Sequence, residues 1–480
     1  MLKYQKDALL VFILLAFTYA YFYQDASDNG DSRLGLTFAI VQEGRLTIDT
    51  FQARKGTTTQ DKAFYEGHYY TDKAIGTSLV AVFFYLPLYG FTWLTHYQLT
   101  LQLTKYFLTF CTIGLISAFA GSLMYLLCKH ISGNRFWAYI VAIAIALGTM
   151  CMPYSIVFYG HQLAAALLFC AFFLIFRLKV NSGTTGKSGL FLIGFLLGLA
   201  LITEFTTLVI VLPLIFYYLY VIWKGQPSRR LSSVILPTLG GLIPLAIMFT
   251  YNILCFGGPF SLGYSYGSNP LFREAMAQGL MGISWPRLDV LYYMTLFPAQ
   301  GLFWQSPVLI MALVGAYFMF RAAQYRAEAL IAAIAFCSYL LINSGYYMWW
   351  GGWAFGTRGI IPMLPFLCLP LVFVPRRLHF LVVILAIISV SQMFIAAASN
   401  IQVPDDFIAN IDKQGYFEYS TIYNYCLEQL LRGRYAFNLG HALLGLKNQM
   451  SLIPVILANL TVLGVFAFHK PPQPASLEHI

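Results

Sequence analysis

The sequence predicts an all-α polytopic membrane protein, and three observations lead to this fold class. Hydrophobic residues make up 59% of the 480 residues and charged residues only 10%. The mean hydropathy is +0.69, whereas a water-soluble domain needs a more polar surface to stay solvated. Basic residues also occur in short groups between long apolar segments, which is the pattern that orients helices in a membrane. We therefore expect one integral membrane domain over residues 1–480.

The composition narrows the possible function classes. The net charge of +10 is spread over short groups, with no basic stripe or tail, which argues against nucleic-acid binding. The eight cysteines form no CxxC pair and many lie in apolar runs, which argues against a zinc site or a disulfide framework. No cluster has convincing metal-ligand spacing, so we assign no metal site, and the use of a divalent ion stays open.

Twelve apolar segments are candidates for membrane helices. They cover residues 7–23, 103–128, 135–152, 160–178, 188–202, 206–223, 232–254, 301–320, 328–345, 359–374, 378–398 and 450–468. If the amino terminus is cytoplasmic, every loop on the cytoplasmic side is basic, as the positive-inside bias requires. These loops are 129–135, 177–187, 224–230, 321–328, 376–377 and the tail with Lys470.

This assignment of the loops to the two sides of the membrane depends on two conditions. The apolar stretch 77–95 must not cross fully, and the proline and glycine inside it favour a re-entrant or interfacial helix on the outer side. The stretch 188–223 must be a hairpin, because a single helix of that length would measure about 54 Å against a hydrocarbon core of about 30 Å. Glu204 then lies at the outward tip, where a carboxylate costs less than in mid-membrane.

Function is expected on the outer face, because the loops assigned to the inner face are short. The first extracytoplasmic loop, 24–102, carries most of the charged side chains and is expected to contain juxtamembrane helices. Loops 255–300 and 399–449 are further outer loops. The first of these is rich in Gly, Ser and Tyr, as a substrate-gating loop would be, whereas the role of the second cannot be read from its sequence.

The first outer loop opens with a predicted helix over 28–44. Leu34, Phe38 and Val41 recur at i, i+4 and i+7, which predicts a short amphipathic helix lying on the membrane. Asp31 lies near its amino end, where an acidic residue is favoured as a cap. A cap and a general base are therefore both open interpretations of Asp31.

Two further pieces of this loop carry charged side chains. Asp49 follows a strand-like Leu-Thr-Ile segment, and 61–76 places several charged residues among three tyrosines. A solvated linker is seldom so aromatic, so we expect this loop to pack. Ordered carboxylates beside cations suit one task, which is to take a proton from a hydroxyl while a cation holds a phosphate leaving group.

These features resemble the GT-C superfamily of membrane glycosyltransferases, most closely its aminoarabinose-transferase and protein O-mannosyltransferase branch. The shared features are a polar loop after the first helix, an acid near a short helix, and a Tyr-Tyr-x-x-Lys segment that enters a helix. The family segment commonly reads Tyr-x-Lys-Pro-Pro, whereas this chain reads YYTDKAIG and keeps only Lys73. The family acid often begins an Asp-Glu pair before an Arg, whereas Asp31-Ser32-Arg33 lacks the second acid.

The resemblance implies an inverting hexosyl- or pentosyltransferase with a polyprenyl-phosphate sugar donor. Asp31 or Asp49 would deprotonate the acceptor, which is a lipid, glycan or protein, and Lys73 would contact the donor phosphate. The other substrate-binding candidates in this loop are Arg33, Asp61, His68 and Asp72. The resemblance also implies a multi-pass protein of a bacterial plasma membrane with its active site facing outward.

Three outer-face positions beyond the first loop are further candidates. His161, at the start of a helix, is either a hydrogen-bonded cap or core residue or a contact to the donor phosphate or sugar. Glu204 either binds acceptor hydroxyls or cations or caps a turn. The aromatic loop 345–359 is either an interfacial belt or a carbohydrate platform beside a phosphate clamp; its candidate residues are Trp350, Trp353 and Arg358.

Two other functions stay open. A secondary transporter would carry ionisable residues at mid-membrane and interrupted helices in matching halves, and the sequence shows neither clearly. A non-catalytic lipid-binding membrane subunit also fits the first outer loop.

Overall fold

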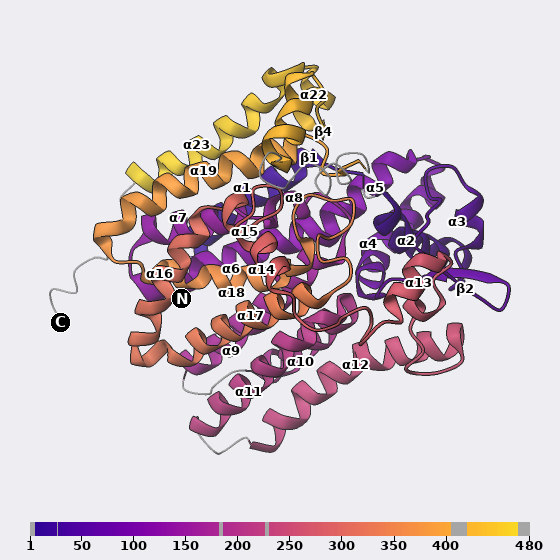
Figure 1. The fold of residues 1–480 in the computed structure, drawn as a ribbon, viewed down its shortest axis with the longest axis horizontal. Coiled ribbons are helices and arrows are strands. Elements are labelled where there is room, and N and C mark those ends of the chain that lie inside the picture. Colours follow the sequence, from indigo (N-terminus) through magenta and orange to yellow (C-terminus); the bar gives the residue numbers. More distant parts are fainter. Residues whose placement is uncertain (1–4, 26, 182–185, 226–229, 405–419, 469–480) are drawn as a thin grey trace.

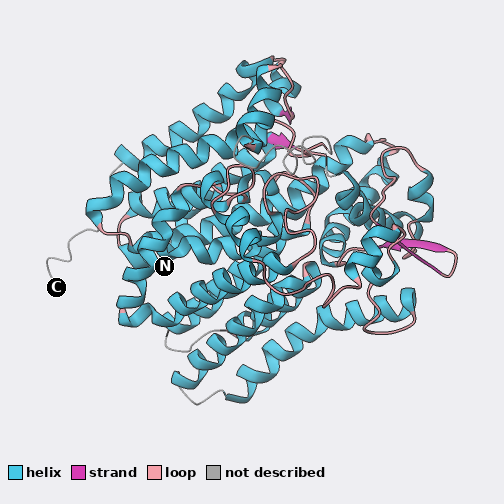
Figure 2. Ribbon diagram, in the orientation of Figure 1, coloured by secondary structure: helices cyan, strands magenta, loops and turns pink. Residues whose placement is uncertain are grey.

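The computed structural model describes residues 5–25, 27–181, 186–225, 230–404 and 420–468, which form a largely helical bundle (Figures 1 and 2). Lys470, residues 182–185 and 226–229 of two expected inner loops, and 405–419 of one expected outer loop lie outside the described residues. In the first half the elements are α1 (Gln5–Tyr21), β1 (Phe22–Tyr23), α2 (Ser27–Phe38), α3 (Asp49–Ala53), β2 (Lys62–Tyr65), β3 (His68–Thr71), α4 (Gly76–Thr95), α5 (Leu101–Thr109), α6 (Leu115–Ser132), α7 (Arg135–Ala146), α8 (Cys151–Tyr154), α9 (Gly160–Val180), α10 (Lys187–Thr203), α11 (Leu208–Lys224) and α12 (Arg230–Phe256). They continue with α13 (Pro270–Met276), α14 (Leu288–Thr295), α15 (Leu302–Gln305), α16 (Val308–Arg321), α17 (Arg326–Gly345), α18 (Leu364–Cys368), α19 (His379–Ala398), α21 (Glu428–Leu431), β4 (Phe437–Asn438), α22 (Leu439–Leu444) and α23 (Ile453–Phe468).

Among the described residues, eight helices are long and apolar enough to cross a membrane. They cover Gly76–Thr95, Leu101–Ser132, Gly160–Val180, Phe205–Lys224, Leu231–Phe256, Ala323–Gly345, Arg376–Ala398 and Asn448–Phe468. Shorter apolar helices cover Arg135–Ala146, Lys187–Thr203, Val308–Arg321 and Arg358–Phe373. The expected all-α, multi-pass membrane protein is therefore confirmed, whereas the expected number of twelve spans stays a prediction.

Several of the expected spans are not continuous α-helices, and two of them show this most clearly. The segment expected over 135–152 stops being regular at Ala146, and short turns lead on to α9. The segment 358–373 alternates between 3₁₀ turns and the short helix α18. It contains three prolines, each of which removes a helical hydrogen bond. Both segments are mostly buried within the protein, where irregular backbone is tolerated at membrane depth.

Described residues at the edges of several expected inner loops meet at one end of the bundle, which we call the basic end. An ion pair of 2.7 Å joins Asp7 at the start of α1 to Arg135 at the start of α7. Trp137 stacks on His379 at the start of α19, with ring centroids 3.5 Å apart. Lys179 at the end of α9 pairs at 2.6 Å with Glu328 at the start of α17. These contacts bring helix ends that are far apart in the sequence to the same end of the bundle.

The first outer loop gathers at the opposite end, beside α5 and α13 (Figure 1). Within this loop β2 pairs with β3 in an antiparallel sheet, and just before it β1 pairs, also antiparallel, with β4 from the last part of the chain. The expected hairpin over 188–223 is present, because α10 ends at Thr203 and α11 begins at Leu208. Its tip, with Glu204, lies at this same end, because Glu204 contacts Arg33 of α2.

Helix α4 is linked to α2 on both sides: directly near its start, and through the following helix α5 after its last residue. Near its start, Thr77 and the Ala74 carbonyl accept hydrogen bonds from Arg33 of α2. After its end, α5 contacts the same helix α2 through Lys105. The connection between α4 and α5 reaches at most about 20 Å, whereas α4 is about 30 Å long. The expectation that this stretch does not cross fully stays a prediction, because α4 is one of the eight described helices that are long and apolar enough to cross a membrane.

Helix α2 differs from its expected position. The predicted helix is present, but every residue from Asn29 to Phe38 is buried. The expectation that it lies on the membrane is wrong, because α4, β3 and the tip of the α10–α11 hairpin contact its polar residues. Its polar residues 29–33 therefore point into the protein rather than toward water.

Candidate functional site

A buried ion pair forms the base of the site. Arg33 Nη2 lies 2.8 Å from Glu204 Oε1, and the two side chains are 2% and 9% exposed. The remaining Arg33 nitrogens donate to Asn29 Oδ1, to the Ala74 carbonyl and to Thr77 Oγ1. Arg33 thus ties α2 to α4 and to the α10–α11 hairpin, and its donors are largely used by protein groups.

The start of α9 fits closely against this pair. A Cβ atom at Gly160 would lie 2.3 Å from Glu204 Oε1 and 3.0 Å from Arg33 Nη1, so only glycine allows this approach. The next residue, His161, has its Nδ1 3.5 Å from Glu204 Oε1 without an aligned hydrogen bond. His161 also lies within electrostatic range of Arg358, Arg33 and Lys73. The start of α9 therefore presents a histidine to a group of three cations.

Lys73 lies between two carboxylates of its own loop. Its Nζ is 3.0 Å from Asp61 Oδ2 and 3.1 Å from Asp72 Oδ2, and all three side chains are less than one-fifth exposed. Burial opposes the charge on Lys73, but Asp61 and Asp72 together raise its pKa above the ordinary value. Burial also raises the pKa of Asp72, against the lowering effect of Lys73. The lysine is therefore charged, and burial favours the protonated form of Asp72.

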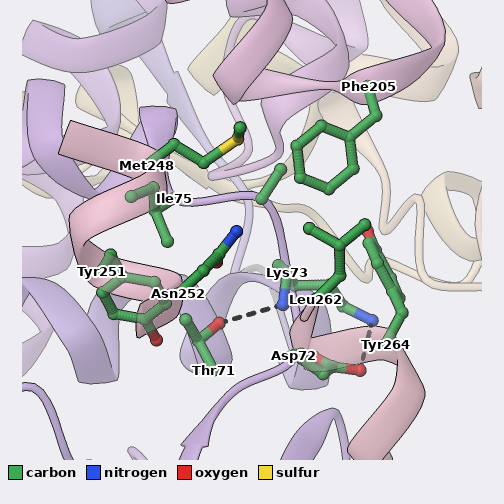
Figure 3. Close-up of a pocket in the computed structure, with 12 residues that line it drawn as sticks. Thr71, Asp72, Lys73, Ile75, Phe205, Met248, Tyr251, Asn252, Leu262 and Tyr264 are labelled. Carbon is green, nitrogen blue, oxygen red and sulfur yellow. Dashed lines mark hydrogen bonds and ion pairs between the residues drawn. The ribbon is translucent and has the colours of Figure 1, made fainter. Parts of the chain in front are cut away.

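A small pocket, with room for about one water molecule, lies beside Lys73 (Figure 3). Its polar side carries Asp72 and Lys73, and Tyr264 lies close to the lysine Nζ, 5.8 Å from the ring centroid. Its other side is more apolar, and Figure 3 shows Phe205 and Met248 lying away from Asp72. Burial raises the pKa of Tyr264 to about 12, so its hydroxyl stays a neutral donor. The pocket thus joins charged groups to an apolar wall.

Arg358 contributes a third cation, from the aromatic loop. Its guanidinium lies over the Tyr159 ring, with Cζ 4.8 Å from the centroid, and Asp61 and Glu204 are within electrostatic range. Gly351 holds a left-handed backbone of φ +87°, and a Cβ there would lie 3.1 Å from Arg358 Cγ. Among the described residues, Arg358 has no ion pair within 4.0 Å. Its guanidinium therefore keeps donors available to an anion.

Asp31 lies on a different face of α2. Successive helical residues project about 100° apart, so Asp31 and Arg33 point to nearly opposite sides. Asp31 Oδ1 is 2.6 Å from Lys105 Nζ. Ser32, between them, bonds to Thr71 and to Asp72 of the lysine cluster. Burial raises the pKa of Asp31 to about 6, even though Lys105 lowers it.

The other candidates lie away from these contacts. Asp49 opens α3, accepts a bond from the Tyr69 amide and pairs with His68 at 2.8 Å, and both side chains are well exposed. The expected strand before Asp49 is reduced to one hydrogen bond, from the Ile48 amide to the Tyr69 carbonyl. Trp350 contacts Trp349, and Trp353 contacts Phe272 of α13. No hydrogen bond, ion pair or ring contact of the described residues joins these four candidates to Lys73 or Arg358.

The sequence analysis did not single out Lys105, Tyr159 or Tyr264. Lys105 had a usable signal, because it is the only charged residue between 97 and 128. A lone lysine in an apolar helix is costly unless it is paired, so it predicts a buried acidic partner. The two tyrosines had no such signal, because tyrosines are frequent throughout this chain.

Comparisons with known proteins leave the function to be argued from these residues. No protein-family model matches the chain, and no curated protein sequence matches it. Within the described residues, no group of three or more His, Cys, Asp or Glu is arranged to hold a metal ion.

Proposed function

We propose that this protein is an inverting glycosyltransferase of the GT-C type. It transfers a hexose or pentose from a polyprenyl-phosphate carrier to a lipid, glycan or protein acceptor on the extracytoplasmic face of a cell membrane. The observation that carries the proposal is Arg358, a cation that stacks on Tyr159 and has no ion-pair partner among the described residues. It lies in one electrostatic cluster with Lys73 and His161 at the end of an apolar bundle.

The charges of this cluster suit one phosphate group. Arg33 is paired with Glu204 and Lys73 with both Asp61 and Asp72, whereas Arg358 has no ion pair among the described residues. With all three carboxylates ionised these six groups are net neutral, and protonation of Asp72, whose pKa burial raises, gives them a net charge of +1. A guanidinium offers paired donors that match phosphate oxygens. The neighbouring helices are long and apolar enough to cross a membrane, which is where a phosphate carried on a hydrocarbon chain is found. The described residues thus favour a lipid-linked donor.

Asp31 is the better of the two candidate bases. A general base works best when its pKa lies near the working pH, and that of Asp31 is raised to about 6. Asp31 faces away from Arg33, and its link to the lysine cluster is the neighbouring Ser32, which bonds to Asp72. In this proposal the acceptor therefore approaches along the Ser32 side of α2. Asp49 instead caps the Tyr69 amide and pairs with His68 near solvent. Both contacts are ordinary structural roles for a surface carboxylate.

The reaction is a single displacement. The acceptor hydroxyl oxygen bonds to the anomeric carbon, while the bond from that carbon to the phosphate oxygen breaks. The hydroxyl proton passes to Asp31, and the electron pair leaves with the polyprenyl phosphate, which gains one negative charge. Arg358 and Lys73 stabilise that charge as it develops.

The test is sugar transfer by purified protein in lipid nanodiscs, with a panel of polyprenyl-phosphate sugars and cell-envelope acceptors. The wild-type protein transfers one of these sugars, and Asp31→Asn lowers the rate about 10²–10⁴-fold, as expected for loss of a general base. Asp49→Asn serves as the matched control and keeps the activity. Binding of the donor without any transfer would identify a non-catalytic lipid-binding subunit, and equal rates in both variants would reject Asp31 as the base.

A further inference from the structure

Lys105 is a buried lysine with an acidic partner on another helix. Its side chain is 5% exposed, and its Nζ lies 2.6 Å from Asp31 Oδ1 and 3.4 Å from Asp25 Oδ1. The Asp31 side chain is 11% exposed, whereas that of Asp25 is 70% exposed. The buried contact of Lys105 is therefore the one with Asp31.

This contact is not needed to fix α2. Arg33 already ties the helix to α4 and α10, and Ser32 bonds to Thr71. Thr37 adds a bond to the Ser78 carbonyl on α4. A buried ion pair adds little stability compared with apolar residues of similar size, because both charges lose their hydration. The distinctive effect of Lys105 is therefore on the carboxylate of Asp31.

We propose that Lys105 is the positioning residue of the base: it holds Oδ1 of Asp31 and keeps this carboxylate ionised, which leaves Oδ2 to accept the acceptor proton. This inference rests on the proposed function, because it assigns Lys105 a role in the same reaction. Lys105 does not touch substrate in this proposal and acts only through Asp31.

The charged groups around Asp31 come from three parts of the chain. Lys105 faces it from α5, Asp25 and Tyr23 from the segment after α1, and Asp28 from α2 itself. Burial, Asp25 and Asp28 raise the pKa of Asp31, whereas Lys105 lowers it. Removing the lysine therefore leaves only influences that favour the protonated acid.

The first test is the pH dependence of kcat/KM in Lys105→Gln, Lys105→Met and Lys105→Arg. In the Gln and Met variants the acid limb moves up by about 1–3 pH units, the usual effect of one nearby opposite charge. Methionine keeps the apolar stem of the lysine and so preserves packing. Lys105→Arg keeps the charge and leaves the acid limb close to that of the wild type, which a purely structural role would not predict.

The matched control is Arg135→Gln at the basic end. This substitution breaks the ion pair between Arg135 and Asp7. That pair is also largely buried and joins two helices, α1 and α7. This variant loses stability but keeps the acid limb in place. An acid limb that stays unchanged in both Lys105→Gln and Lys105→Met overturns the proposal.

A second readout does not depend on transfer. Infrared difference spectra over a pH series report the protonation of Asp31, with Asp31→Asn identifying its band. The band titrates at higher pH in Lys105→Gln than in the wild type, even if the protein transfers no sugar. An identical titration in both proteins overturns the role of Lys105, whereas a shifted band without any transfer rejects the proposed function alone.

Discussion

The two ends of the bundle use buried charge in different ways. At the basic end, Asp7 pairs with Arg135, and Lys179 pairs with Glu328. At the other end, Lys73 lies between two carboxylates, Arg33 pairs with Glu204, and Arg358 stacks on Tyr159 without an ion-pair partner among the described residues. At the basic end, these ion pairs join neighbouring helices. The other end has such ion pairs too, but it also contains Arg358, a cation without an ion-pair partner among the described residues.

This difference separates structural charge from functional charge. Ion pairs at both ends hold helices together, so pairing alone does not mark a site. A partly buried guanidinium with free donors is different, because its lost hydration is only partly offset by one aromatic ring. Such a guanidinium is typical of a site that binds an anion. We therefore expect equivalent substitutions at the two ends to have different effects.

The largest effect is expected from removing the buried acid at each end. Glu204→Ala leaves Arg33, which is 2% exposed, without its carboxylate, and lowers the free energy of unfolding by about 3–5 kcal/mol. Glu328→Ala costs less, because the Lys179 side chain is 29% exposed and can turn toward water. Thermal unfolding in one detergent measures both. Equal losses would show that burial of the remaining cation does not set the cost.

Arg358→Ala is expected to lower kcat/KM for the donor by about 10²–10³-fold, as loss of a group that stabilises developing charge does. The temperature of unfolding stays near that of the wild type, because no ion pair is lost. Arg376→Ala, an exposed arginine at the basic end, is the matched control and keeps both quantities. A large loss of stability in Arg358→Ala without an effect on donor use would make this arginine a structural residue.

The pH dependence follows from Asp31. Because its pKa is raised to about 6, kcat/KM falls about tenfold for each pH unit below that value as the base is protonated. The free energy of unfolding changes with pH in the opposite direction. The raised pKa of Asp31 means that the folded state favours the neutral acid and is therefore stabilised at low pH. That contribution is full below the ordinary pKa of 3.8 and is lost as the pH rises through about 6. A flat rate between pH 5 and 7 would speak against Asp31.

The smallest effect is expected from Asp49→Asn. Its pair with His68 joins side chains that are 56% and 38% exposed, and exposed pairs contribute about 0–1 kcal/mol. Thermal unfolding and sugar transfer therefore both stay close to the wild type. A hundredfold loss of transfer would show that the active site lies at Asp49, beside the β2–β3 hairpin.

Local patterns in the sequence predict part of this site. Helix length alone places Glu204 at a hairpin tip, because one helix cannot span 188–223. The charged residues of 61–76 predict the Lys73 cluster, since they are neighbours in the chain. The Arg33–Glu204 pair joins residues 171 positions apart, and no local pattern encodes such a contact. The burial of α2 is likewise set by α4 and the hairpin tip, which its own periodicity does not describe.

The most direct test of the central claim is native mass spectrometry of the protein purified from a membrane that contains polyprenyl-phosphate sugars. The account predicts a co-purified polyprenyl phosphate or its glycosylated form, depleted in Arg358→Ala and retained in Arg376→Ala. Only bulk phospholipid, in equal amounts in the wild type and both variants, would contradict a phosphate site at Arg358.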